Sequence, residues 1–389
     1  MNSLFRATWY LLAVFTLTAC SILSSETEPT ETPEILRWAA RESPQPTSTP
    51  TATPAPTPSA APYSAALVAC QKPDDVNLIE MLLTFVADWD GDREIYLANW
   101  DGSLEYQLTN DAQNDYSPRW SPDGNLLAWV SGTTLLISKW ADAEAGLLSL
   151  ETLYSAFDWS PESDKIVYVG NSGGSNSLWL VDVQSSAEVN LTGQYSFIPR
   201  APSFSPDGDL ILFRVDSPEG TDLVARWFTI RPDGGGLKEL SFPGVFTYNA
   251  NWHLDGSHIR FDGTSFSNGG IDRYVASLDG ELELLRFDTI DPTAPTWSPD
   301  GTLIAYQSGN SIYLSTADET IIFPLLIREE GEPKITAKTW APDNRRLAYN
   351  IYRTPDTSDL YMLDICDGWT WRIADAVESD TPPSFRARP

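Results

Sequence analysis

A nucleophile motif stands near the middle of the chain, at Gly170-Asn171-Ser172-Gly173-Gly174, which fits the G-x-S-x-G pattern of serine hydrolases. That chemistry requires the serine on a sharp turn between a strand and a helix. Here the motif lies between two β-rich runs, 165–169 and 177–181, with no α/β pattern after it. We therefore expect a loop in a β-hairpin and no catalysis by Ser172.

Two further sets of side chains have the types that bind metal ions. The two histidines of the chain, His253 and His258, flank one turn, and across a hairpin we expect their rings to point in different directions. Asp88, Asp90 and Asp92 alternate like the start of a calcium loop, but the glycine and the bidentate glutamate of an EF-hand are missing. The sequence predicts structural turns in both places and no cofactor, with weak Ca²⁺ binding by the three aspartates left open.

The elements that position these residues repeat along the chain. In each repeat an aromatic residue precedes a turn of the type SPDG, in which proline presets φ and glycine relieves a steric clash. The aromatic residues are 39 to 48 residues apart: Trp120, Trp159, Phe204, Trp252, Trp297 and Trp340. Each turn precedes a β-rich run such as LLAWV or LIAYQ. This period, with about four strand-like runs per unit, is typical of a propeller blade.

Two incomplete units flank these repeats. Leu82 to Val86 matches the run after a turn, and Thr381 to Phe385 matches the run before one. Phe385 also keeps the spacing, 45 residues after Trp340. We expect the two ends to share a blade, giving an all-β, seven-bladed propeller closed by pairing of its N- and C-terminal strands. A six-bladed propeller is the alternative.

One stretch resembles a known family. Phe85 to Asn110, followed by Asp115 and P-x-W-SPDG, is similar to the repeat of TolB-type propellers, with DG after the second strand, EIYL in the third, a further DG, and LTN in the fourth. The resemblance covers roughly residues 80–389 and implies a propeller of WD-repeat-like blades. It implies no single activity, because such propellers serve many functions. The family has six blades and a separate N-terminal domain, and this sequence departs from it in both respects.

The N-terminus has the pattern of an export signal. Residues 1–19 combine Arg6 with an apolar stretch too short to span a bilayer, and Leu17-Thr18-Ala19-Cys20 matches a bacterial lipobox that would place lipid on Cys20. Residues 20–66 contain a Pro/Thr-rich run and predict a disordered tether. The propeller domain then takes residues 67–389. We expect an extracytoplasmic, membrane-anchored lipoprotein at the bacterial cell surface or in the periplasm; an ordinary signal peptide is the alternative.

Two cysteines remain besides Cys20. Cys70 precedes the first strand of the shared blade, and Cys366 ends the run YMLDIC in the third strand of the last complete blade. An oxidising compartment favours a disulfide between them, which would join the ring where it opens and contribute about 2–5 kcal/mol. Two buried free thiols are the alternative.

Charge and loop positions limit the partners. The formal net charge of −29 and the lack of a basic stripe exclude nucleic acid, because binding phosphates requires clustered Lys and Arg. We expect a monomer that binds a protein or peptide on one face, where the loops from fourth to first strands and from second to third strands gather. The candidate contact residues there are Asp115, Tyr116, Arg200, Tyr248, Asp291 and Asp380.

These features favour a non-catalytic, surface-anchored scaffold of the cell envelope. The alternative is a secreted propeller that binds a glycan, or processes a glycan or peptide, with a metal held by loop carboxylates. The scarcity of histidine and the lack of a nucleophile–base pair argue against the enzyme. Tryptophans nearer loops or strand edges are further candidates for contacts: Trp89, Trp100, Trp140, Trp369 and Trp371.

Overall fold

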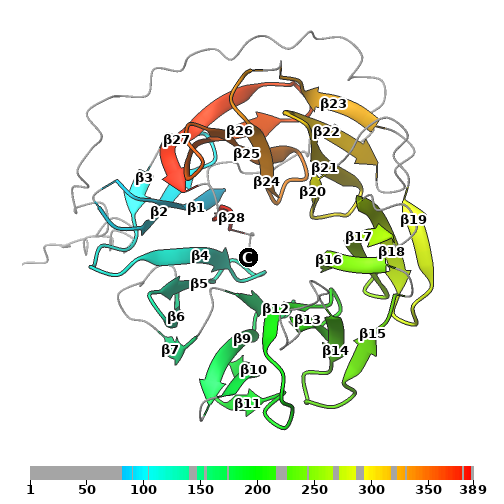
Figure 1. The fold of residues 1–389 in the computed structure, drawn as a ribbon. Helices are drawn as coiled ribbons and strands as arrows, with labels where there is room; N and C mark the ends of the chain where they lie inside the picture. Colours follow the sequence, from blue (N-terminus) through cyan, green and yellow to red (C-terminus); the bar gives the residue numbers. More distant parts are fainter. Residues whose placement is uncertain are drawn as a thin grey trace, which may run out of the picture. The chain divides into compact units, whose positions relative to one another are not determined.

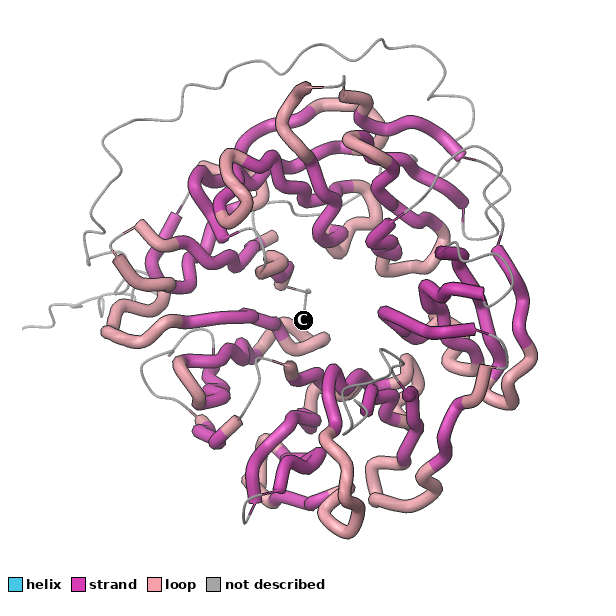
Figure 2. Tube along the Cα trace, in the orientation of Figure 1, coloured by secondary structure: helices cyan, strands magenta, loops and turns pink. Residues whose placement is uncertain are grey.

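The computed structural model describes residues 81–89, 91–103, 105–139, 147–152, 156–172, 175–215, 226–242, 245–265, 271–285, 293–316, 322–328, 331–378 and 381–386. All of them belong to one compact unit, residues 42–389. They form strands and turns without a helix (Figure 2), which confirms the all-β prediction for these ranges. Accordingly, none of these residues contributes a helix long and apolar enough for a bilayer span.

Several predictions fall on residues that the structure does not describe. The export signal of residues 1–19, the lipidated Cys20, the tether of residues 20–66 and Cys70 all lie outside the described ranges. Cys366 is described and takes part in a disulfide bond. Its pairing with Cys70 stays a prediction.

Five separate four-stranded antiparallel sheets follow one another along the chain, each with its first strand at one edge. Each sheet is one propeller blade built around one of the predicted aromatic–turn elements. Their strands are β4 (Asp115–Trp120), β5 (Leu126–Ser131), β6 (Thr134–Lys139) and β7 (Leu148–Glu151); β8 (Phe157–Trp159), β9 (Lys165–Ser172), β10 (Ser175–Asp182) and β11 (Glu188–Asn190); β12 (Pro199–Phe204), β13 (Ile211–Val215), β14 (Arg226–Ile230) and β15 (Lys238–Leu240); β16 (Val245–Trp252), β17 (His258–Ser265), β18 (Ile271–Ser277) and β19 (Leu282–Leu285); β20 (Thr293–Trp297), β21 (Leu303–Ser308), β22 (Ser311–Thr316) and β23 (Ile322–Leu326). In Figure 1 the labelled first strands β4, β12, β16 and β20 lie toward the centre.

The other strands form one eight-stranded sheet, in the order β24-β25-β26-β27-β1-β2-β3 with β28 paired to β1. These strands are β24 (Ile335–Trp340), β25 (Arg346–Tyr352), β26 (Thr357–Asp364), β27 (Thr370–Glu378), β1 (Leu82–Ala87), β2 (Glu94–Asn99), β3 (Glu105–Gln107) and β28 (Ser384–Phe385). The described residues therefore form five separate blades and one continuous sheet, not the seven separate sheets that we expected. The reason is one backbone pairing, Ala87 with Val377, which joins β27 to β1.

The two ends of the propeller meet at β28. Leu83 pairs with Phe385 and Thr84 with Ser384, in antiparallel register. The amide of Arg386 donates to the carbonyl of Leu82 at 2.9 Å, and the Phe385 ring joins the core formed by the β1–β2 and β25–β27 strands. The expected pairing of the C-terminal segment with the first strand of the domain is therefore present (Figure 1).

The blade aromatics join each blade to the one before it. In three blades the indole Nε1 donates to the carbonyl of the residue that precedes the aromatic of the preceding blade: Trp159 to Arg119 at 3.1 Å, Trp252 to Ser203 at 3.1 Å and Trp340 to Thr296 at 2.9 Å. Phe204 has no ring N–H, and its backbone amide instead donates to the Asp158 carboxylate at 2.9 Å. Buried apolar side chains fill the space between successive sheets, so the repeat explains both the blades and their packing.

The ends of the strands define two faces of this unit. On the loop face, loops between blades lie beside turns within blades: Gly132 donates its amide to Asn114 at 2.9 Å, and Tyr352 to Lys334 at 2.8 Å. On the turn face, the SPDG-type turns lie beside the turns between third and fourth strands, as in the 2.9 Å bond from the Val183 amide to Asp164. The loops between blades and the SPDG-type turns therefore lie on opposite faces.

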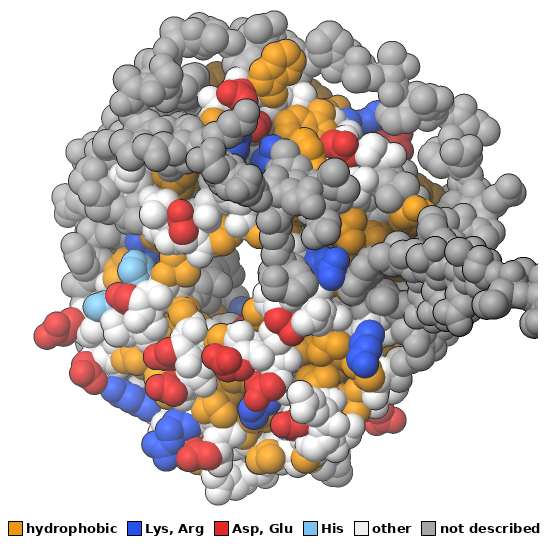
Figure 3. Space-filling model, turned by 180° about the vertical axis from the view of Figure 1, so that it is seen from behind, with side chains coloured by type: hydrophobic (Ala, Val, Ile, Leu, Met, Phe, Trp, Pro, Cys, Tyr) orange, Lys and Arg blue, Asp and Glu red, His pale blue; other side chains and the backbone are white. Residues whose placement is uncertain are grey.

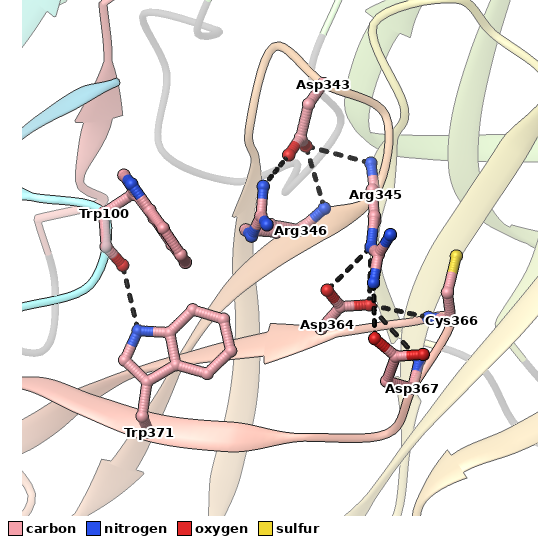
Figure 4. A network of polar contacts seen from close by, with 8 residues as sticks. All are labelled: Trp100, Asp343, Arg345, Arg346, Asp364, Cys366, Asp367 and Trp371. Atoms are coloured by element: carbon pink, nitrogen blue, oxygen red, sulfur yellow. Dashed lines mark hydrogen bonds and ion pairs between the residues drawn. The ribbon is translucent and has the colours of Figure 1, made fainter. Parts of the chain in front are cut away.

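A polar network on the turn face joins the β24–β27 strands to the β2–β3 turn (Figure 4). Arg345 binds Asp364 through Nε at 2.7 Å and Asp367 through Nη2 at 2.5 Å, which fixes the turn that carries Cys366. The neighbouring Arg346 lies 4.2 Å over the ring of Trp100. The Trp100 carbonyl in turn accepts from Trp371 Nε1 at 2.9 Å, so side chains as well as backbone pairing hold the junction.

We expect Arg345→Ala to lower the free energy of unfolding by about 1.5–3 kcal/mol, because it removes hydrogen bonds to two carboxylates. The Asp364 side chain is only 7 % exposed and would lose its main partner. Urea unfolding followed by fluorescence measures the loss. Arg345→Lys is the matched control, which keeps the charge but not the geometry, and a free energy of unfolding unchanged in Arg345→Ala would contradict the role assigned to this network.

Candidate functional site

Two loops of the loop face are tied together where the domain begins. The turn between β1 and β2 carries Asp88 and Asp92, and the loop between β3 and β4 leads to Asp115 and Tyr116. The backbone amide of Arg93 donates to the Asn114 side chain at 2.9 Å, and the amide of Asp115 donates to the Arg93 carbonyl at 2.7 Å. The structure thus brings the predicted calcium loop and two of the predicted contact residues into one place.

The solvent-facing layer of these two joined loops is acidic. Asp88 and Asp111 are exposed, and Asp92 is half-buried. The base among them, Arg93, forms a 2.9 Å ion pair with Glu378 at the end of β27 and lies 5.2 Å over the Tyr116 ring. Its charge is therefore already compensated, and the surface has a negative excess that favours cationic groups.

The inner layer consists of two buried carboxyl groups, Glu94 and Asp115, each 0 % exposed. Burial raises the pKa of Glu94 to about 7, and hydrogen bonds from the Thr109 hydroxyl and the Asp111 amide offset only part of that effect. Burial likewise raises the pKa of Asp115 to about 6, although the hydroxyls of Thr109 and Ser131 lower it. We call the set Asp88, Asp92, Glu94, Asp111 and Asp115 the acidic corner.

The acidic corner corrects one sequence prediction and adds a residue. Asp115 is buried and presents no carboxylate at the surface, whereas its neighbours Asp88 and Asp111 are exposed. Sequence reasoning missed Glu94 because it reads as the first residue of the strand EIYL. Its nearness to three aspartates was the signal that could have found it.

The other predicted contact residues are only partly described. Arg200 is half-buried on β12, opposite Arg214 in the register with β13. Tyr248 lies on β16, whereas Asp291 and Asp380 lie outside the described residues. Their role in binding stays a prediction.

The predicted calcium loop is described except for Asp90. Asp88 accepts the backbone amide of Gly91 at 3.1 Å, as in a short polar turn. Within the described ranges, no group of three or more His, Cys, Asp or Glu residues is arranged to hold a metal ion. Calcium binding by Asp88, Asp90 and Asp92 stays a prediction.

The two histidines lie close together, contrary to expectation, and are the pale blue side chains in Figure 3. The Nδ1 atoms of His253 and His258 lie 3.0 and 2.7 Å from the same Oδ2 of Asp255. In the SPDG turns the serine Oγ contacts the turn aspartate instead, as Ser205 does with Asp207 at 2.6 Å. His253 therefore takes the place of that serine, and the pair stabilises a turn.

The serine motif lies where a β-hairpin was expected. Ser172 ends β9 and the next described residue, Ser175, begins β10. The two strands pair directly, with Ser172 opposite Ser175. Because a nucleophile elbow requires a helix after the serine, this arrangement lacks the geometry of a serine hydrolase.

The loop tryptophans differ from expectation. Trp89, Trp100 and Trp371 are partly buried against the core, and the Trp89 ring packs at a tilt of 50° on Tyr96 with ring centroids 4.2 Å apart. Trp140 lies outside the described residues. Trp369 is 73 % exposed on the turn face. Most of this set thus contributes packing, not a contact surface.

Comparison with known proteins gives a family model described as the TolB β-propeller domain, which matches residues 140–321. The protein TolB homolog of Chlorobaculum tepidum is 28 % identical over 114 residues, which is 28 % of this chain and 26 % of that protein. The Tol-Pal system protein TolB of Desulfosudis oleivorans is 28 % identical over 119 residues, 30 % of this chain and 27 % of that protein. The matched segments thus span about a quarter of the length of these relatives.

Solved structures share the fold at low identity. The oligogalacturonate lyase of Vibrio parahaemolyticus superposes with a TM-score of 0.55 at 15 % identity, covering 75 % of this chain and 85 % of the lyase. At that identity the likeness concerns the propeller alone.

Proposed function

Because the chain carries a TolB-type β-propeller, we propose that it is a non-catalytic scaffold of the cell envelope that binds a protein or peptide partner with its loop face. The observation that carries this proposal is the acidic corner. Its exposed aspartates lie on two loops that are hydrogen-bonded to each other within one compact unit, where Arg93 is already paired with Glu378. Preformed, charged loops on a rigid scaffold suit recognition, since little ordering has to accompany binding.

The relatives' names support the envelope setting, because one of them is a Tol-Pal system protein. We further propose the export signal of residues 1–19, lipid on Cys20, the tether of residues 20–66, and a monomer that binds no nucleic acid. A disulfide from Cys366 to Cys70 would anchor the start of the propeller domain. The glycan-binding alternative has less support, since the partly buried Trp89, Trp100 and Trp371 offer no stacking platform.

We also infer that the eight-stranded sheet comprises two blades, which would give seven in total. One would be β28-β1-β2-β3 and the other β24–β27. A single residue pair, Ala87 with Val377, joins them, whereas β1 pairs with β2 over six residues. Each would then have an aromatic on its first strand, Phe385 and Trp340 respectively.

Charge reversal in the acidic corner tests the proposed function. We expect the double variant Asp88→Lys/Asp111→Lys to weaken binding of the envelope partner about tenfold, ~1.4 kcal/mol, by introducing like charges against a cationic surface. Capture of the partner from detergent-solubilised envelopes, followed by titration with the purified partner, measures the change.

The matched control is the double variant Asp209→Lys/Glu281→Lys, which reverses two exposed carboxylates on turns of the opposite face. Melting temperatures verify that both variants fold. If the two double variants bind the partner with equal affinity, the loop face is not the binding surface.

A further inference from the structure

We propose that Asn190 carries an N-linked glycan at the outer edge of its blade. Asn190-Leu191-Thr192 has the form Asn-X-Ser/Thr, the acceptor pattern for such glycans in exported proteins. It is the one tripeptide of this form among the 389 residues. The glycan is a group that the chain carries, not a ligand that it binds. The proposal depends on export of the chain but not on partner binding by the loop face.

The strand β11 places Asn190 at the edge of a sheet. β11 is the outermost strand of the blade β8–β11 (Figure 1), and its three residues are all exposed. The apolar Val189 in its middle is 47 % exposed. A strand in this position has unpaired backbone groups on its free side, where another chain can add a strand. A bulky, hydrophilic glycan on Asn190 would cover that edge.

The side chain of Asn190 leaves its nitrogen available. Its Oδ1 accepts the backbone amide of Thr192 at 3.1 Å, which forms an Asx turn. Nδ2 donates no hydrogen bond to any residue that the structure describes. An N-linked side chain keeps its amide oxygen, so a sugar on Nδ2 would remove no contact of the fold.

The residue beside this carboxamide is a glycine. A Cβ on Gly193 would lie 2.5 Å from Nδ2, 2.8 Å from Cγ and 2.9 Å from Oδ1 of Asn190. The φ of Gly193 is not positive, so the backbone itself does not require glycine here. The space for the carboxamide does require it, because any larger residue would push the Asn190 side chain out of its turn. The fold thus keeps the acceptor side chain in one exposed position.

Thr192 supplies the hydroxyl of the acceptor pattern and sets the time of the reaction. In the folded chain Thr192 is 1 % exposed, and its Oγ1 accepts the Leu178 amide at 2.8 Å. An enzyme cannot reach this hydroxyl once the segment has docked on β10. The sugar is therefore attached during export, before the blade has folded, and stays on the exposed side afterwards.

The transfer joins Asn190 to a sugar without any oxidation or reduction. The donor is an oligosaccharide linked to a lipid through pyrophosphate, and a glycosyltransferase of the envelope catalyses the step. Nδ2 forms a bond with the anomeric carbon of the first sugar, while the bond from that carbon to the pyrophosphate oxygen breaks. The lipid pyrophosphate leaves with the electron pair, and one Nδ2 proton passes to a base of the enzyme.

Mass spectrometry of the tryptic peptide of residues 166–200 tests the proposal, with the full chain purified from envelopes of its own organism. We expect a mass excess of sugar residues that fragmentation assigns to Asn190. Asn190→Gln should lose this excess completely, because glutamine is not an acceptor. Thr192→Ser should keep it, since serine supplies the same hydroxyl. Melting temperatures of both variants verify that they fold.

Asn171→Gln is the matched control, because Asn171 is exposed in the same peptide but is followed at the second position by Gly173. Its mass excess should equal that of the wild type. A wild-type peptide of unmodified mass alone would overturn the proposal, and so would an excess that persists in Asn190→Gln. Partner affinity should be equal in the wild type and Asn190→Gln, so failure of the proposed scaffold function would leave this test unaffected.

Discussion

Removal of residues 381–389 should lower the melting temperature by roughly 10 °C or more, the largest effect that we expect from any change in this chain. The deletion takes away β28 and leaves the first strand of the domain with an open edge on its central side. Leu83, which is 0 % exposed, would lose its partner Phe385. Burial of a phenylalanine side chain alone accounts for about 3–5 kcal/mol.

The same segment makes contacts beyond its own strand pair. The Trp120 amide donates to Ser384 Oγ at 3.2 Å, and Arg386 Nε donates to the Gly124 carbonyl at 2.8 Å. The Arg386 guanidinium also lies over the Trp120 ring, 5.7 Å from its centroid. The last residues therefore connect the eight-stranded sheet with the blade of β4–β7, and losing them opens two interfaces at once.

Differential scanning calorimetry of the deletion variant measures this effect. Deletion of residues 387–389 alone is the control, because it spares β28, and it should leave the melting temperature within about 2 °C. Phe385→Ala should give an intermediate loss. If the long deletion melts at the wild-type temperature, closure through β28 contributes nothing to stability.

The regular part of the fold could be predicted from sequence because each blade repeats the same local chemistry. The aromatic residue, the proline and glycine of the turn and the β-rich run after it are all local signals. The pairing of Phe385 with Leu83 was also predictable, although about 300 residues separate them, because Phe385 keeps the spacing of the blade aromatics. The single pairing of Ala87 with Val377 carries no such signal, and it changed the division into sheets.

The candidate site was predictable only as a region. Sequence spacing placed Asp88, Asp92 and Asp115 on loops, but burial depends on tertiary contacts that no local pattern encodes. Asp115 is covered because its amide binds Arg93 in a loop more than twenty residues earlier. For the same reason Trp89 looked like a loop residue, yet its Nε1 donates to the Asp375 carbonyl of β27 at 3.0 Å and its ring joins the core.

Truncation of a buried blade aromatic should destabilise the fold far more than truncation of an exposed tryptophan in a nearby turn. We expect Trp340→Ala to lower the free energy of unfolding by about 3–5 kcal/mol, because it empties a site in a packed core. Trp340 is 4 % exposed and its Nε1 donates to the Thr296 carbonyl of the preceding blade at 2.9 Å. Trp340→Phe should cost less, since it keeps most of the buried ring and loses mainly a hydrogen bond of about 0.5–1.5 kcal/mol.

Trp369→Ala supplies the matched control, because this side chain is 73 % exposed in the turn between β26 and β27. Its effect should stay within about 0.5 kcal/mol, as for ordinary surface substitutions. Urea unfolding of the three variants, followed by circular dichroism, gives the ranking. If Trp369→Ala lowers the free energy of unfolding as much as Trp340→Ala does, the turn of Cys366 to Trp369 contributes to the core. The interpretation of the blade aromatics as the main link between sheets would then be wrong.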